Sequence, residues 1–237
     1  MKIHRFFLNT GFLEGEISIS DIEFVHQIRD VLKLHNGEMC VLFNAAGQEA
    51  QATITAYHEN RALLNVEKIT QREEGKTRII LYCAVLKREN FELVVQKATE
   101  LGVSEIIPIL TQRTIKTGLR KDRLEKIATE ASEQSGRVSI PQIGTVCSFT
   151  EALEKAQDNI YTIVLHTGGE RIAQEGKDKI GSIGVFIGPE GGFTDEEIQQ
   201  AREYQYHIHT FPNMTLRAET AAIIGVFWAR EIVNNKE

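Results

Sequence analysis

The sequence predicts an α/β fold with a mostly parallel sheet, preceded by a smaller β-rich region. From about residue 79 onwards, apolar runs alternate with amphipathic helical patterns. This alternation is typical of βαβ units whose strands are buried on both faces. Residues 1–70 instead carry short strand-like segments separated by polar turns, and they contain no proline. We therefore expect two domains, at 1–70 and 71–237.

The first region predicts a small barrel. Residues 39–43 and 49–57 read as two strands joined by a turn of small residues, and residues 62–66 read as a third strand. Residues 26–32 predict one short helix before them. Short strands with polar turns are typical of such a barrel.

A polar stretch at 70–76 is the expected linker, and the second region follows it. Its continuous apolar runs predict buried strands, and its 3.6-residue patterns predict helices. Strands are expected at 79–86, 106–110, 160–165, 183–187 and 207–211, and helices at 89–101, 119–134, 148–157, 194–203 and 218–233.

Composition narrows the class of protein. The chain has 237 residues, of which 42% are hydrophobic, and no apolar run is long enough to cross a membrane. The N-terminus lacks the apolar stretch of a signal peptide, and three widely spaced cysteines lack metal-ligand spacing. His207 and His209 share one strand face without the further ligands of a metal site. We expect a cytoplasmic protein with no membrane segment and no metal.

Charge is unevenly distributed along the chain. The net charge is −6, yet residues 76–126 carry eleven Lys and Arg against six Asp and Glu. A basic band on an acidic protein points to a phosphate-rich partner, although a solvated basic face explains the charge alone equally well. The band includes Lys87, Arg88, Arg113, Lys116, Arg120, Lys121, Arg123 and Lys126.

A glycine-rich segment at 188–192 follows the predicted strand 183–187 and precedes a predicted helix. Thr194 and Glu197 have the spacing of a capping box, which marks the start of that helix. Glycines between a strand and a helix let backbone N–H groups approach a ligand closely, although a tight turn alone would need them too. The segment has neither the Walker A nor the GxGxxG spacing, which disfavours nucleoside triphosphate and nicotinamide cofactors.

Two other segments are expected at the same edge of the sheet. Arg217 and Glu219 stand at the start of the last predicted helix, and His166 follows the predicted strand 160–165. A charged loop beside a glycine-rich loop is typical of a cofactor pocket, although the helix dipole alone also favours Glu219 at that position.

Together these motifs resemble a known family: the bacterial 16S ribosomal RNA uridine-N3 methyltransferases, the RsmE branch of the knotted SPOUT methyltransferases. The resemblance spans nearly the whole chain. The segments that carry it are 4–7, 26–38, 97–103 with Pro108 and Arg113, 130–137 with Pro141, 188–194 and 216–221.

The resemblance implies a PUA-like barrel at 1–70 that helps to hold RNA, and a trefoil-knotted catalytic domain at 71–237. It implies S-adenosylmethionine as cofactor, a homodimer, and 16S rRNA of the 30S subunit as substrate, methylated at N3 of a uridine in the decoding region. The implied cofactor residues are Leu165, His166, Thr167, Ile187, Gly188, Pro189, Glu190, Gly191, Gly192, Phe211, Asn213, Thr215, Leu216, Arg217, Ala218, Glu219 and Thr220. The expected RNA contacts are Arg5, Arg29, Lys33, Lys87, Arg88, Arg113, Lys116, Arg120, Lys121 and Arg123.

The chemistry of the target suggests the catalytic residues. Uridine N3 carries a proton at neutral pH, so methyl transfer requires that proton to be removed or the resulting anion to be stabilised. Glu219 or Glu190 is a candidate proton acceptor, and Arg217 or Arg137 is a candidate partner for the anion. We favour Arg217 and Glu219. The alternatives are a knotted methyltransferase acting on another RNA position, such as a ribose hydroxyl, and a non-catalytic RNA-binding assembly factor.

Overall fold

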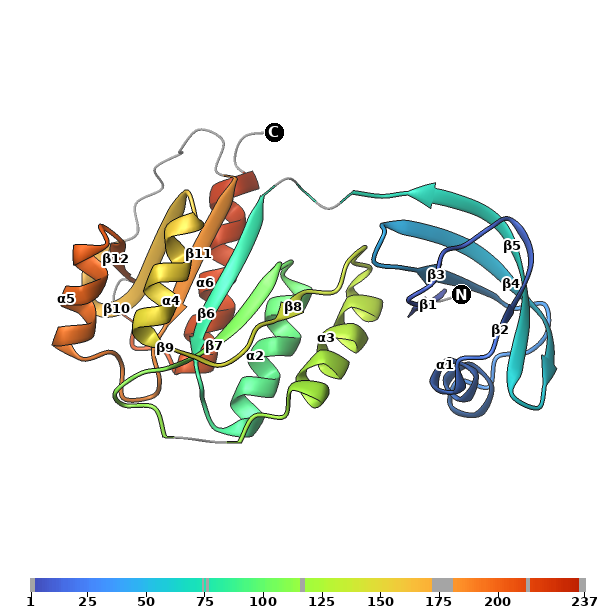
Figure 1. The fold of residues 1–237 in the computed structure, drawn as a ribbon, viewed down its shortest axis with the longest axis horizontal. Coiled ribbons are helices and arrows are strands. Elements are labelled where there is room, and N and C mark those ends of the chain that lie inside the picture. The colour runs from blue at the N-terminus through green and yellow to red at the C-terminus, as the bar shows by residue number, and fades with distance from the viewer. Residues whose placement is uncertain are drawn as a thin grey trace. The chain divides into compact units, whose positions relative to one another are not determined.

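The computed structural model describes residues 3–73, 75, 77–115, 118–171, 181–211 and 214–234 (Figure 1). Its contacts divide the chain into two units. One unit comprises Met1–Glu74 and Ser132–Ile140, and the other comprises Gly75–Ala131 and Pro141–Glu237.

The N-terminal unit is built on a five-stranded mixed sheet in the order β1-β3-β4-β5-β2. β1 pairs with β3 in parallel, and the other neighbours are antiparallel. Its bounds are β1 His4–Phe7, β2 Gly15–Ile19, β3 Met39–Phe43, β4 Gln48–His58 and β5 Arg61–Gln71. The three predicted strands are thus confirmed as β3, β4 and β5.

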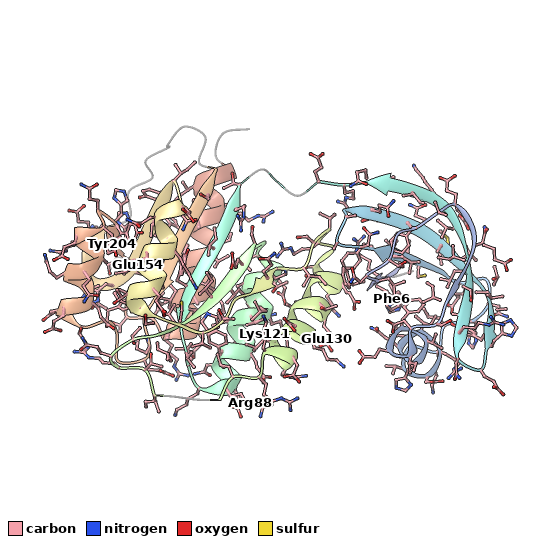
Figure 2. The ribbon with its side chains drawn as sticks, in the orientation of Figure 1. Phe6, Arg88, Lys121, Glu130, Glu154 and Tyr204 are labelled. Carbon is pink, nitrogen blue, oxygen red and sulfur yellow. The ribbon has the colours of Figure 1, made fainter. Side chains whose placement is uncertain are left out.

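A helix covers the core of this unit. α1 spans Ile22–His26 and continues as a π-helical turn over Gln27–Val31, in place of the single predicted helix at 26–32. Apolar side chains from the strands and from this helix form one buried cluster. Phe6 of β1 is 1% exposed and packs edge-on against Phe24, with 5.4 Å between the ring centroids (Figure 2).

The segment 132–140 is fastened to β1. The backbone N–H of Phe7 donates to Glu133 Oε1 (2.9 Å), and Arg5 Nη2 donates to the carbonyl oxygen of Arg137 (3.2 Å). These long-range bonds explain why residues 132–140 belong to the N-terminal unit although they follow most of α3 in the sequence.

The C-terminal unit is a parallel sheet in the order β12-β10-β11-β6-β7-β8, with β9 also pairing with β7. All of these strand pairs are parallel, which confirms the predicted sheet. The strands are β6 Arg78–Ala84, β7 Glu105–Leu110, β8 Gln142–Ile143, β9 Cys147–Ser148, β10 Tyr161–Arg171, β11 Ser182–Ile187 and β12 His207–Thr210. The helices are α2 Arg88–Glu100, α3 Lys121–Ser135, α4 Phe149–Lys155 with a 3-10 turn at Ala156–Asp158, α5 Asp195–Glu203 and α6 Ala218–Asn234.

Helices cover both faces of the sheet. α4 and α5 share a buried cluster with side chains of β6, β7, β10, β11 and β12, in which Tyr82 and Phe186 stack 4.4 Å apart. α2 packs against α6, and α6 lies on β6 and β11; in Figure 1, α4 stands in front of the sheet and α6 behind it. No helix in the described part of the chain is long and apolar enough to cross a membrane.

Close approach of α6 to the sheet depends on Gly225. A Cβ at this position would lie 2.9 Å from Leu165 Cδ1 and 3.2 Å from Val185 Cγ1. Because the glycine has no side chain, the helix sits directly over β10 and β11. Its first residues, roughly two turns or about 10 Å earlier, lie towards the carboxyl ends of these strands, at the lower edge of the sheet in Figure 1.

The strand β10 corrects one expectation. The apolar run predicts a strand that ends at Leu165, whereas β10 continues to Arg171, with a register shift between Leu165 and Glu170 in its pairing with β12. His166 and Thr167, expected after the strand, therefore lie within its span, at the irregularity. The continuation is polar and pairs at the sheet edge, so hydrophobic periodicity does not reveal it.

Candidate functional site

The candidate cofactor residues lie at the carboxyl ends of three neighbouring strands. β12, β10 and β11 are adjacent and parallel, so their carboxyl ends meet at one edge of the sheet, the lower edge in Figure 1. Leu165 and His166 belong to β10, Ile187 ends β11, and Phe211 follows β12. Ligands of open parallel sheets bind outside this edge. The sheet order thus brings together three segments that are far apart in the sequence.

Residues 188–193, here called the glycine loop, turn sharply between β11 and α5. Gly192 has a left-handed φ of +69°, and its N–H donates to the carbonyl oxygen of Pro189 (2.8 Å). A Cβ on Gly188 would lie 3.2 Å from the backbone nitrogen and ring of Phe193, which is 2% exposed. Glu190 and Gly191 are exposed at the tip of the loop. The glycines therefore serve a compact turn that presents backbone to solvent at the candidate site.

The predicted capping box at the start of α5 is confirmed. The Glu197 backbone N–H donates to Thr194 Oγ1 (3.3 Å), and the Thr194 N–H donates to Glu197 Oε2 (2.9 Å). The second carboxylate oxygen, Oε1, accepts the backbone N–H of Gln112 (2.8 Å), which follows β7. Glu197 is 3% exposed, so one buried carboxylate joins the glycine loop to the β7–α3 connection.

Arg113 makes a second tie between these two segments. Its Nη1 donates to the carbonyl oxygen of Gly191 (2.7 Å) and also reaches that of Phe193 (3.4 Å). Its side-chain carbons lie against Gly191, since a Cβ there would be 3.3 Å from Arg113 Cδ. The sequence predicts Arg113 as an RNA contact, whereas the structure places it on the glycine loop.

The start of α6 supplies the charged pair. Arg217 precedes the helix and is exposed, whereas Glu219 lies in its first turn and is 9% exposed. No hydrogen bond joins the Glu219 carboxylate to another residue in the described part of the chain. A carboxylate in the first turn is favoured by the helix dipole. The carboxylate of this largely covered residue therefore keeps its oxygens available to a ligand.

Glu190 is the other candidate proton acceptor. Its side chain is exposed, and its charge acts on the thiol of Cys83 near the end of β6. Burial raises the pKa of that thiol, and the Glu190 carboxylate adds to the rise. Glu190 therefore lies at the same sheet edge as Glu219, with more contact to solvent.

His166 lies beside several charged groups. Partial burial lowers the pKa of its imidazole; Asp195 opposes this shift, while Arg113 and Arg202 add to it. The net pKa lies below the ordinary value, so the ring is neutral at pH 7. A neutral imidazole at this edge can accept or donate a hydrogen bond.

We predict that the His166 ring titrates below the ordinary value of about 6.5 in an NMR titration. Because the unfolded chain binds this proton more readily, His166 makes stability rise as the pH increases through the window just below that value. The D195N variant removes the opposing carboxylate and is expected to lower the midpoint further. A midpoint at or above the ordinary value would contradict the assignment.

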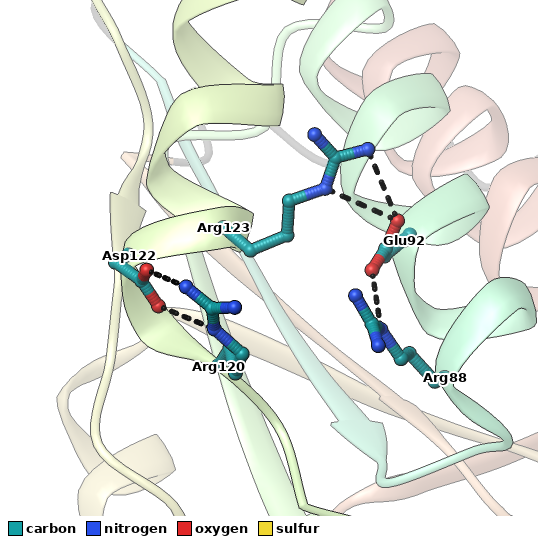
Figure 3. A network of polar contacts seen from close by, with 5 residues as sticks. All are labelled: Arg88, Glu92, Arg120, Asp122 and Arg123. Carbon is teal, nitrogen blue, oxygen red and sulfur yellow. Dashed lines mark hydrogen bonds and ion pairs between the residues drawn. The ribbon is translucent and has the colours of Figure 1, made fainter.

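Five residues of the basic band form what we call the basic edge. Lys87 and Arg88 follow β6, while Arg120, Lys121 and Arg123 stand at the start of α3. Arg88 Nε donates to Glu92 Oε1 (3.0 Å), and Arg123 Nε donates to Glu92 Oε2 (3.4 Å), so one carboxylate gathers two arginines from two helices (Figure 3). Arg120 pairs with Asp122 in the same view. Each such exposed pair adds little stability, roughly 0–1 kcal/mol.

The other candidate residues belong to the N-terminal unit. The side chain of Arg5 is 16% exposed, pairs with Glu49 (2.8 Å) and lies over the ring of Phe43. Arg29 pairs with Asp30 and donates to the carbonyl oxygen of Glu59, and Lys33 is exposed with a φ of 54°. Arg137 is 8% exposed and reaches Ser139 Oγ (3.4 Å). Lys116 and Asn213, also predicted, lie outside the described residues.

Three features of the site escape sequence reasoning. The hydrogen bond from Gln112 to Glu197 joins residues 85 positions apart. The capping-box pattern indicates only the bonds between Glu197 and Thr194. Glu92 carries no motif, and Gly225 sits unmarked in an apolar helix. The described residues contain no group of three or more His, Cys, Asp or Glu side chains suited to a metal ion.

Comparison with known proteins gives a consistent assignment. Residues 73–229 match the family model described as an RNA methyltransferase domain. The chain is 31% identical over 226 residues to ribosomal RNA small subunit methyltransferase E of Mesomycoplasma hyopneumoniae, covering 93% of this chain and 96% of the relative. It is 28% identical over 235 residues to the protein of that name from Rickettsia conorii, covering 97% and 96%.

A solved structure extends the likeness to both units. The ribosomal RNA small subunit methyltransferase E of Neisseria gonorrhoeae, bound to S-adenosyl methionine, has a TM-score of 0.87, 27% identity, and 97% coverage of each chain. The matched domain and the curated relatives show that the chain belongs to the RNA methyltransferase family that includes ribosomal RNA small subunit methyltransferase E.

Proposed function

We propose that this protein transfers a methyl group from S-adenosylmethionine to N3 of a uridine in the decoding region of 16S rRNA, within the 30S subunit. The observation that carries the chemistry is Glu219: a residue only 9% exposed whose carboxylate bonds no other described residue, in the first turn of α6. Family membership supports an RNA substrate, and the solved relative that binds the cofactor supports the methyl donor.

The residues at this edge fit S-adenosylmethionine. The exposed Gly191 leaves backbone groups open at the loop tip, where a side chain would obstruct them. Loop residues 188–192, the end of β10 and the segment before α6 would hold the cofactor. When bound, the cofactor supplies an electrophilic methyl group on a sulfonium, so the reaction needs no further activation of the leaving group.

The remaining task for the protein concerns the uridine. Its N3–H proton must leave before or during transfer, and we assign Glu219 as its acceptor. The negative charge that develops on the uracil ring needs a donor, and Arg217, two residues earlier, supplies a permanent positive charge. The target base must be unpaired or extruded to reach these groups.

The basic edge suits RNA phosphates. Arg88 and Arg123 each use one face of the guanidinium on Glu92 and leave further N–H donors for a phosphate, while Lys87 is exposed nearby. Phosphate contacts of this kind position the RNA and carry no sequence information. Recognition by shape favours the assembled 30S subunit over naked rRNA, and action on ribosomal RNA places the protein in the cytoplasm.

Three architectural features belong to the same proposal. The N-terminal mixed sheet is a PUA-like barrel, and the polypeptide around β10, the glycine loop and the described residues just before α6 forms a trefoil knot. The return of the chain from the edge strand β12 to a helix over β6 and β11 supports the knot. Homodimer formation would cover the exposed Phe227 and the half-buried Trp228 of α6.

Methyl transfer is tested with small ribosomal subunits from a strain that lacks the enzyme. We expect purified protein to move the label from methyl-labelled S-adenosylmethionine into 16S rRNA. Label on a ribose hydroxyl would show that the protein is an RNA methyltransferase whose target is not uridine N3. Stoichiometric binding to the subunit with no transfer, under conditions where the cofactor binds, would favour a non-catalytic assembly factor.

A further inference from the structure

We infer that Arg113 is a positioning residue that holds the glycine loop in its ligand-binding shape, and that it is not a phosphate ligand of the RNA. The inference rests on the proposed function only in taking the glycine loop as the cofactor loop. It assigns to a residue of the basic band a task on the cofactor side of the site.

The contacts of the guanidinium carry the argument. Nη1 of Arg113 bonds the carbonyl oxygen of Gly191 at 2.7 Å and approaches that of Phe193 at 3.4 Å, so one nitrogen joins the two sides of the turn around Gly192. The aliphatic part of the side chain lies against Gly191. A charged donor makes these bonds stronger than those between neutral groups.

The segment that presents Arg113 is itself fixed. Thr111 and Thr114 close a turn on either side of it: the Thr111 N–H donates to Thr114 Oγ1 (3.0 Å), and the Thr114 N–H donates to the carbonyl oxygen of Thr111 (3.2 Å). The Gln112 N–H is held by the buried Glu197. Arg113 therefore reaches the loop from a rigid base.

The glycine loop needs such a support. Glycines at 188, 191 and 192 give its backbone more freedom than other residues would, and that freedom must be lost when a ligand binds. Its tip, Glu190 and Gly191, is exposed and gains no rigidity from burial. A bond to the Gly191 carbonyl limits the motion of the tip before the ligand arrives.

Neighbouring arginines differ in their partners. Arg88 and Arg123 pair with the carboxylate of Glu92 on the helix surface, where their remaining donors are exposed. Arg113 is exposed as well, but its Nη1 bonds backbone carbonyls of the glycine loop, 78 and 80 positions away, and no carboxylate among the described residues. This contrast separates a loop support from surface charges available to phosphate, and it makes Arg88 the matched comparison.

The test compares R113M, R113K and R88M with the natural protein in three measurements. Amide hydrogen exchange at Gly192 in the ligand-free protein reports loop order. Calorimetry gives the Kd of S-adenosylmethionine, and titration with small subunits across salt concentrations gives RNA affinity and its salt slope.

We expect R113M to speed exchange at Gly192 and to weaken cofactor binding by about tenfold, with an unchanged salt slope. R113K keeps the positive charge and one donor nitrogen. We expect it to restore part of the protection at Gly192 and part of the cofactor affinity. R88M is expected to leave the loop and the cofactor Kd unchanged and to reduce the salt slope by about one.

Unchanged Gly192 exchange and cofactor affinity in R113M, with a reduced salt slope, would overturn the inference and make Arg113 a phosphate ligand. If the natural protein itself binds no S-adenosylmethionine, the proposed function fails, and exchange at Gly192 alone decides the role of Arg113. If R113M does not fold, R113Q, which also removes the charge, takes its place in all three measurements.

Discussion

The E219Q variant is expected to lose most of its methyl-transfer turnover while it retains cofactor and RNA binding. Glutamine keeps the shape of the side chain but cannot accept the N3 proton, and general-base catalysis typically contributes about 10²–10⁴-fold. Glu219 is 9% exposed at the start of α6, and its carboxylate bonds no other described residue, so its replacement leaves no described group unpaired.

Single-turnover rates on small subunits, with separate Kd values for cofactor and RNA, distinguish this role from a binding role. The matched control is E231Q, which makes the same change at an exposed position of the same helix. Natural turnover in E219Q would remove Glu219 from the chemistry and leave Glu190 as the candidate acceptor.

Replacing Glu197 by alanine is expected to be the most destabilising of the changes considered. The substitution removes the acceptor for the buried Thr194 N–H and for the Gln112 N–H. Each hydrogen bond to a charged group is worth roughly 1.5–3 kcal/mol, so we expect the free energy of unfolding to fall by about 3 kcal/mol. At about 2–4 °C per kcal/mol for a chain of this size, the Tm should fall by roughly 10 °C.

Thermal and urea unfolding measure this effect. Q199A, which truncates an exposed side chain of the same helix, is expected to change the stability by no more than about 0.5 kcal/mol. E197Q keeps one acceptor oxygen for the two backbone donors, so its stability should lie between that of E197A and that of the natural protein. An E197A variant as stable as Q199A would show that the two backbone donors find other acceptors.

Much of the C-terminal unit follows from local patterns. The apolar runs at 79–86 and 183–187 predict β6 and β11 to within a few residues, because fully buried parallel strands leave an unbroken hydrophobic signal. The capping pattern at Thr194 predicts the start of α5 because the capping interaction lies within a single helical turn and is therefore visible in the local sequence.

The elements that the sequence does not reveal depend on distant partners. β1 has only four residues and forms by pairing with β3 over thirty positions later, and β8 and β9 have two residues each. Residues 132–140 belong to the N-terminal unit because Glu133 and Arg137 form hydrogen bonds with β1. No local pattern in the sequence of α3 indicates these bonds. A short segment has no period to detect, and its stability comes from tertiary contacts.

The candidate site shows the same division. Backbone loops at strand ends are predictable, since glycines and caps mark them, and the parallel sheet places their residues together. The task of a charged side chain is not predictable from its type. Arg113 and Arg88 belong to one basic band, yet one lies on backbone carbonyls and the other on a carboxylate.

The central claim concerns one atom of one nucleoside, and nucleoside mass spectrometry tests it most directly. Small subunits from a strain lacking the enzyme are treated with the purified protein and S-adenosylmethionine, and their rRNA is digested to nucleosides. We predict N3-methyluridine from a single site in the decoding region, absent without protein and strongly reduced with E219Q. A different methylated nucleoside, or none while both cofactor and subunit bind, would contradict the proposed reaction.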